Sequence, residues 1–157
     1  MKQYLFTILL FFAGSAVYAQ SVAFGDLLNL TSMTGVQEHD LLLAKGFKAA
    51  GTQTFDGKAF EVFSKIIKGT PDKTETVSLG PGIKTASGVL THQIVYYTQQ
   101  ESDLNNLLAE AKKSNMSLVF QGTDATGNIY RFDNSLFRAS ISLAFDKKSG
   151  NVDVQQK

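Results

Sequence analysis

Apolar and polar residues alternate along residues 137–145 with a period of two. The apolar positions are Phe137, Ala139, Ile141, Leu143 and Phe145, and polar Arg138, Ser140 and Ser142 lie between them. Because successive side chains of a strand point to opposite faces, this pattern predicts a strand with one buried face. Burying each of its large apolar side chains contributes roughly 2 kcal/mol, so we expect a second layer to cover that face.

Hydrophobic periods along the rest of the chain predict an ordered series of helices and strands. Spacings of three and four predict helices over residues 21–30, 37–45 and 101–111. Alternating segments rich in β-branched and aromatic residues predict strands over residues 59–67, 74–79, 89–98, 118–121, 129–133, 137–145 and 152–154. A tight turn at Asp56-Gly57 makes the first of these segments the second strand of a hairpin. Both faces of segment 89–98 are partly apolar, which favours a central place for it in the sheet.

Together these elements predict an α+β fold, with an antiparallel sheet of about seven to eight strands and two to three helices packed on one face. The order of helix, left-handed exit, strand, turn and strand occurs twice, with the exits at Gly46 and Asn115. One interpretation is an internal duplication with repeats at residues 20–98 and 99–157. Coincidence in a chain of helices and hairpins is the alternative interpretation.

The predicted strand over residues 59–67 has apolar side chains on both faces. We expect Phe60 and Val62 to face the core, with Glu61, Phe63 and Lys65 on the other side. In the duplicated arrangement, the two core positions correspond to Tyr130 and Phe132, about 70 residues later.

This organisation resembles two groups of proteins. The N-terminal segment, which ends in Ala19-Gln20, looks like the signal of many uncharacterised secreted proteins of Gram-negative bacteria. The tandem arrangement is similar to the β-lactamase-inhibitor-protein-like fold, in which two helix-plus-four-strand repeats form a concave sheet that grips a partner protein. That second resemblance spans nearly all of the chain after residue 19. This sequence lacks the cysteines of that inhibitor, and no functional residue of the inhibitor can be assigned to a position of this sequence.

The first nineteen residues, 1–19, predict a cleaved secretion signal. Lys2 precedes an apolar run from Leu5 to Ala13, and Val17-Tyr18-Ala19 places small residues before the expected cleavage point. The run is shorter than the ~20 apolar residues that span a bilayer, which disfavours a membrane anchor. The chain has no cysteine for lipid attachment. We therefore expect a single domain at residues 20–157, free in the periplasm or outside the cell, without membrane insertion after cleavage.

The balance of charges disfavours one class of partner. The chain has 15 Lys and Arg residues and 14 Asp and Glu residues, and loss of Lys2 with the signal leaves the domain formally neutral. The sequence contains no long run of basic residues, so neither nucleic acid nor an anionic membrane surface is an expected partner. A protein partner in the cell envelope stays open.

Residues suited to catalysis or metal binding are sparse. The chain has no cysteine and two histidines, His39 and His92, so we expect no metal site and no cofactor. The Gly-x-Ser-x-Gly motif of serine hydrolases does not occur, and no catalytic residue can be identified. The remaining enzymatic hypothesis uses His92, or a pair among Asp124, Asp133 and Asp146, as acid and base on a small envelope substrate.

The sheet face opposite the core offers the leading hypothesis for function. With the faces as predicted, this face carries Phe63, Lys65, Gln93, Val95, Tyr97, Arg131, Arg138, Ser140 and Ser142. Aromatic and Arg side chains in one patch are the types that anchor protein interfaces. The sequence therefore favours a secreted, non-enzymatic module that binds a protein or envelope ligand through this face. An ordinary solvated face and assembly through exposed strand edges are the alternatives.

Overall fold

The computed structural model describes residues 21–84 and 88–157, so the predicted signal at residues 1–19 lies outside the described residues. The helices of the described part are α2 (Phe24–Leu30), α3 (Gly35–Ala44) and α4 (Glu101–Lys113). Its strands are β1 (Lys48–Phe55), β2 (Lys58–Ile66), β3 (Thr74–Leu79), β4 (Ile83–Lys84), β5 (Leu90–Thr91), β6 (Gln93–Thr98), β7 (Ser117–Thr123), β8 (Gly127–Asp133), β9 (Phe137–Ala144) and β10 (Gly150–Gln156). None of the described helices is long and apolar enough to cross a membrane.

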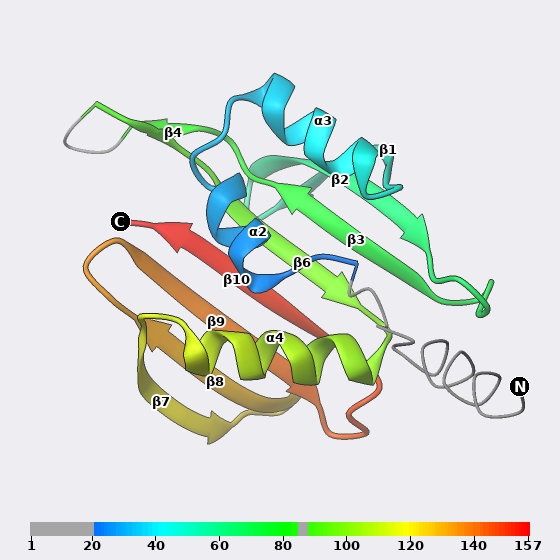
Figure 1. The fold of residues 1–157 in the computed structure, drawn as a ribbon, viewed down its shortest axis with the longest axis vertical. Coiled ribbons are helices and arrows are strands. Elements are labelled where there is room, and N and C mark those ends of the chain that lie inside the picture. The colour runs from blue at the N-terminus through cyan, green and yellow to red at the C-terminus, as the bar shows by residue number, and fades with distance from the viewer. Residues whose placement is uncertain (1–20, 85–87) are drawn as a thin grey trace, which may run out of the picture.

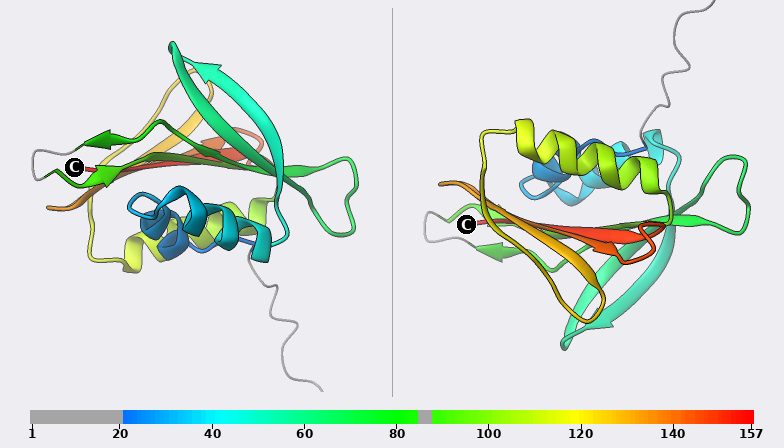
Figure 2. Two further views of the ribbon diagram at one scale, coloured as in Figure 1. Left: turned by 90° about the horizontal axis from the view of Figure 1, so that it is seen from above. Right: turned by 90° about the horizontal axis from the view of Figure 1, so that it is seen from below.

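Eight strands form one antiparallel sheet in the order β1-β2-β3-β6-β10-β9-β8-β7 (Figure 1). Strands β4 and β5 pair with each other in a separate two-stranded sheet. The three helices lie on one face of the large sheet (Figure 2). This arrangement confirms the predicted α+β class, the number of strands in the sheet and the single helical layer. Strand β6 lies at the centre of the sheet, as its two partly apolar faces predicted.

The core lies between the helices and the sheet. One row of paired residues crosses the sheet on this side, and its members are Phe63, Val77, Tyr96, Val152, Ile141 and Tyr130. The helices cover the sheet with Phe24, Leu27, Leu30, Leu42 and Leu107, each at most 2 % exposed. Burial of such side chains contributes roughly 1.5–3 kcal/mol each, which makes this layer the main source of stability.

Both edges of the large sheet, at β1-β2 and at β7-β8, bend away from the helices, so the helix-free side is concave (Figure 2). Each edge strand carries a β-bulge, between Ala49 and Gly51 in β1 and between Leu118 and Phe120 in β7. Bulges increase the local twist of a strand. Nearly every residue of these two edge strands is exposed. We call the helix-free side of β2, β3, β6, β10, β9 and β8 the concave face.

The two halves of the sheet share an order of elements, with α3 before β1, β2, β3 and β6, and α4 before β7, β8, β9 and β10. Their bulges match at Gly51 and Phe120, 69 residues apart. At this separation Phe63 corresponds to Phe132, and both side chains are buried. The sequence-based match of Val62 with Phe132 is therefore wrong by one residue, which in a strand exchanges the two faces. Descent of the halves by duplication stays a prediction.

The predicted left-handed exit at Asn115 is wrong. Gly46 does have a positive φ, of 83°, whereas Asn115 is not among the residues with positive φ. Helix α4 ends instead with the Ser114 hydroxyl, which donates a 2.6 Å hydrogen bond to the Ala111 carbonyl. This bond satisfies a terminal carbonyl without a left-handed residue.

Most predicted strands differ from the structure by one or two residues at their ends, and two of the differences have a clear structural cause. Strand β9 ends at Ala144, and the Phe145 side chain is 60 % exposed because it lies in the turn beyond the buried stripe. The predicted strand over residues 89–98 is interrupted at His92. The backbone N–H of His92 donates a 2.8 Å hydrogen bond to the Thr31 carbonyl instead of to a neighbouring strand. As a result, β5 pairs with β4, and only β6 belongs to the large sheet.

Candidate functional site

The strand register places seven of the nine predicted binding residues on the concave face. Side chains alternate along a strand, so residues paired with Val95 in neighbouring strands share its face. By this register the concave face carries Gln93, Val95, Tyr97, Arg131, Arg138, Ser140 and Ser142. It also carries Phe60 and Val62, whose predicted place on the core-facing side is therefore wrong, and it carries Thr76, Ser78, Asn151 and Asp153, which the sequence-based prediction missed.

Phe63 and Lys65 lie on the helix-covered side, so their predicted place on the binding face is wrong. The Phe63 ring is 1 % exposed and meets the His39 ring edge to face, with centroids 4.9 Å apart. The Lys65 ammonium donates a 2.9 Å hydrogen bond to the Ser21 hydroxyl and lies 5.5 Å from the centroid of the Phe47 ring. Alternation could not choose between the faces, because two apolar residues on the concave side of β2 are buried as well.

Most polar side chains at the centre of the concave face have no hydrogen-bond partner among the described residues. Gln93 and Asp153 are the exceptions, since the Gln93 amide donates a 2.8 Å hydrogen bond to the Asp153 carboxylate on β10. The side chains of Tyr97, Ser140 and Ser142 are half-buried and form no hydrogen bond within residues 21–84 and 88–157. Such donors and acceptors are open to water or to a ligand.

Two arginines lie toward the β8-β9 end of the concave face. The Arg131 guanidinium lies 5.1 Å from the centroid of the Phe120 ring, in a cation–π contact. Arg138 is the cross-strand neighbour of Asp133. A 2.5 Å contact with the Lys157 ammonium, and more weakly the charge of Arg138, hold the pKa of Asp133 below its ordinary value. Both arginines line a pocket of about 310 Å³, so their charged groups are accessible.

A second pocket, of about 260 Å³, lies between the β1-β2 hairpin and the two central strands. It is lined by Phe55 and Phe60, whose rings pack edge to face 5.4 Å apart, and by Gln93, Asn151 and Asp153. Burial raises the pKa of Asp153, and the hydrogen bond from Gln93 opposes this rise only in part. Asn151 and Asp153 alternate with the two buried valines of β10, and that pattern could have placed them on this face from sequence.

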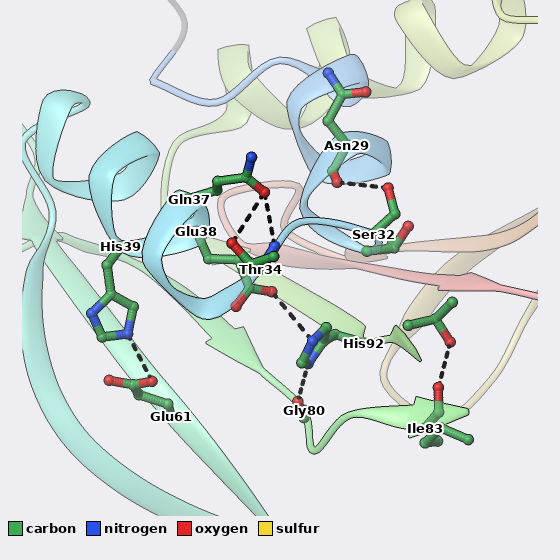
Figure 3. A network of polar contacts seen from close by, with 12 residues as sticks. Asn29, Ser32, Thr34, Gln37, Glu38, His39, Glu61, Gly80, Ile83 and His92 are labelled. Carbon is green, nitrogen blue, oxygen red and sulfur yellow. Dashed lines mark hydrogen bonds and ion pairs between the residues drawn. The ribbon is translucent and has the colours of Figure 1, made fainter. Parts of the chain in front are cut away.

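His92 lies between α3 and the sheet (Figure 3), and it lines neither of these two pockets. Its Nδ1 donates a 3.0 Å hydrogen bond to the Gly80 carbonyl, because a carbonyl can only accept, and this bond selects the tautomer. Its Nε2 lies 3.9 Å from Oε1 of Glu38, and both side chains are largely buried. Burial raises the pKa of Glu38, while the charge of His92 acts in the opposite direction. The imidazole therefore faces a buried carboxyl group.

A second group of buried acids lies among β3, β6 and α4. Glu75 and Asp103 are each 3 % exposed, and the Tyr96 side chain is fully buried. One oxygen of each residue has no hydrogen-bond partner among the described residues. Burial, and next the charge of Glu75, raises the pKa of Asp103 and also that of Tyr96. This cluster is closed to solvent, so it affects stability and offers no binding surface.

The three candidate catalytic aspartates each serve a turn or a strand end. Asp124 accepts a 2.7 Å hydrogen bond from the Thr126 hydroxyl and another from its backbone N–H, and these bonds lower the pKa of Asp124. Asp146 accepts a 2.9 Å hydrogen bond from the backbone N–H of Lys148. Asp133 is paired with Lys157, the residue after β10. Within the described residues, no group of three or more His, Cys, Asp or Glu side chains is placed to hold a metal ion.

The chain matches no protein-family model, no curated protein and no solved structure. The two resemblances seen in the sequence therefore stay predictions. The geometry and chemistry of the concave face therefore carry the information about function, because a fold alone does not determine a function.

Proposed function

We propose that this protein is a secreted, non-enzymatic module that binds a protein or envelope ligand on its concave face. The observation that carries the proposal is the set of half-buried polar side chains without hydrogen-bond partners on β6 and β9, among the described residues. No helix of the described part covers this face, and its curvature brings several strands within reach of one ligand (Figure 2).

The composition of the concave face supports a ligand over solvent alone. Tyr97, Arg131 and Arg138 lie there among Ser, Thr, Asn and Gln residues. Tyr and Arg dominate the binding energy of protein interfaces, because they offer a large contact area together with directional hydrogen bonds.

The predicted secretion signal directs the search for this ligand to the cell envelope and its surroundings. The resemblance to the β-lactamase-inhibitor-protein-like fold is a reason to test a partner protein first. Acid–base chemistry at His92 has less support, because the free ring nitrogen faces Glu38 and the residue lines neither of the two concave-face pockets.

Affinity capture from an envelope extract tests the proposal. The native protein is compared with a Tyr97→Ala, Arg138→Glu variant and with a matched control, Asn106→Ala, Lys113→Glu, on exposed positions of α4. We expect one partner to be retained by the native protein and by the control, and to be lost by the concave-face variant. Thermal unfolding checks that all three proteins are folded. Equal retention by the three would contradict binding through this face.

A further inference from the structure

The pocket beside the β1-β2 hairpin combines an aromatic wall with acidic and amide groups. Phe60 is 4 % exposed, whereas Phe55 is 49 % exposed, so one ring of the edge-to-face pair is open to a ligand. Asp153 and Asn151 of β10 line the same pocket, and Gln93 of β6 lies beside them. An aromatic surface next to a few convergent polar groups is the usual make-up of a small ligand site.

Asp153 has no cationic partner among the described residues. Its carboxylate accepts one side-chain hydrogen bond, from Gln93, while burial raises the pKa of the group. Lys58 lines the pocket but forms no ion pair with Asp153 in the described part of the chain. Asp56 also belongs to the lining, so two acids and one base give this pocket a formal negative charge. A half-buried carboxylate in this setting gains most from a ligand of opposite charge.

We propose that this pocket binds an organic cation, an ammonium or guanidinium group, with Asp153 as its counter-ion and the Phe55 ring as its aromatic wall. A cation is attracted both to the face of an aromatic ring and to a carboxylate that no other cation neutralises. The volume of about 260 Å³ fits one such group, either a free small amine or the Lys or Arg side chain of a protein. The inference rests on the proposed function, because it names the chemistry of a ligand on the same concave face.

Titration of the purified protein with two cations tests this inference. The probes are tetramethylammonium and Nα-acetyl-lysine methylamide, and Nα-acetyl-norleucine methylamide is a neutral ligand of similar shape. The NMR signals of the Gln93 and Asn151 side-chain amides report on the pocket. We expect saturable shifts with both cations and binding of the neutral ligand weaker by about tenfold or more. Equal binding of the neutral ligand would overturn the proposal.

Three variants locate the site. Asp153→Asn keeps the shape of the side chain and removes its charge, so we expect the dissociation constant for both cations to rise about tenfold or more. Phe55→Ala changes a half-exposed side chain, leaves the core intact and should weaken binding several-fold. Asp72→Asn removes an exposed charge in the β2-β3 turn and should leave binding unchanged. Unchanged affinity of both pocket variants would overturn the proposed site.

Two further comparisons separate the sources of the cation and the two proposals. Tighter binding of a lysine-containing peptide than of tetramethylammonium would identify a protein side chain as the source, and the reverse order would identify a free amine; both support the cation class. If the cations do not bind but partner capture still depends on Tyr97 and Arg138, only the proposed cation site in the pocket is overturned. If the cations bind but partner capture does not depend on Tyr97 and Arg138, only the binding of a partner by the wider concave face is overturned.

Discussion

Gln93 and Asp153 lie diagonally across the two central strands, β6 and β10, and the Gln93 amide donates a 2.8 Å hydrogen bond to the Asp153 carboxylate. Because β6 belongs to the first half of the sheet and β10 to the second, this bond joins the two halves at the centre of the concave face. It also favours the charged form of Asp153, the one acid of β10, against the larger effect of burial.

Replacement of Gln93 by Leu should raise the pKa of Asp153 further. The hydrogen bond from Gln93 favours the charged carboxylate, and burial opposes it, so removal of the bond leaves burial unopposed. Carbon-13 NMR of the carboxyl groups during a pH titration measures this change. The pKa of Asp103, on the other side of the sheet, serves as an internal control and should not move. A pKa of Asp153 that stays constant or falls would show that the Gln93 amide does not favour the charged carboxylate.

Replacement of Asp103 by Asn should stabilise the protein at pH 7. Burial and the charge of Glu75 raise the pKa of Asp103 above 3.8, with weaker opposition from Gln100, Lys65 and Ser102. The folded state therefore binds a proton more tightly than the unfolded state, and the free energy of unfolding falls as the pH rises from 3.8 through the folded-state pKa. The variant has no buried carboxylate to ionise. Its free energy of unfolding should therefore be higher than that of the native protein by on the order of 1 kcal/mol at pH 7, and by less near pH 4.

Urea unfolding at both pH values measures this difference. Asp72→Asn, at an exposed turn position, is the matched control and should follow the native pH dependence. A native protein more stable than Asp103→Asn at pH 7 would show that the buried carboxylate is stabilised in a way that the structure does not contain.

Replacement of Phe63 by Ala should cost about 3–5 kcal/mol in the free energy of unfolding. The ring is 1 % exposed under the helical layer, so its loss leaves a cavity. Phe145→Ala, at a position 60 % exposed, should change stability by less than about 0.5 kcal/mol. Chemical denaturation of both variants tests whether Phe63 lies on the core side of β2 and whether Phe145 lies outside the buried part of β9. Similar costs for the two substitutions would place Phe63 outside the core.

Replacement of Gly127, the first residue of β8, by Ala should lower the free energy of unfolding by about 2 kcal/mol or more. A Cβ at this position would overlap the Leu143 carbonyl oxygen on β9. Gly25→Ala in α2 is the control, since nothing lies within 4 Å of its Cβ position and Ala favours a helix by up to about 1 kcal/mol. The midpoint of thermal unfolding should therefore be higher for the native protein than for Gly127→Ala, and no higher than for Gly25→Ala. The opposite order would contradict the register of β8 with β9.

Local patterns were enough to predict most of the fold. The alternation of Ala139, Ile141 and Leu143 predicted the buried side of β9, and the spacing of Leu104 and Leu107 predicted the buried side of α4. These elements have one apolar face each, so a local period determines which side the core must cover.

The misplaced residues depend on contacts between distant parts of the chain. Both sides of β2 are apolar and buried, so the side of Phe63 depends on where the helices pack. The break at His92 depends on its backbone hydrogen bond to Thr31, 61 residues earlier in the chain. The Phe55 side of the second pocket depends in the same way on the hairpin lying beside β6 and β10. No period along the sequence contains such information.

Site-specific photo-crosslinking in living cells tests whether the concave face binds a ligand, because it reports which face of the protein a ligand touches. A photoreactive phenylalanine derivative is placed at Tyr97, on the concave face, and in a separate variant at Asn106, on the exposed side of α4. We predict an adduct of defined mass from the Tyr97 position and none from the Asn106 position. Adducts of the same mass from both positions, or from Asn106 alone, would contradict a binding function for the concave face.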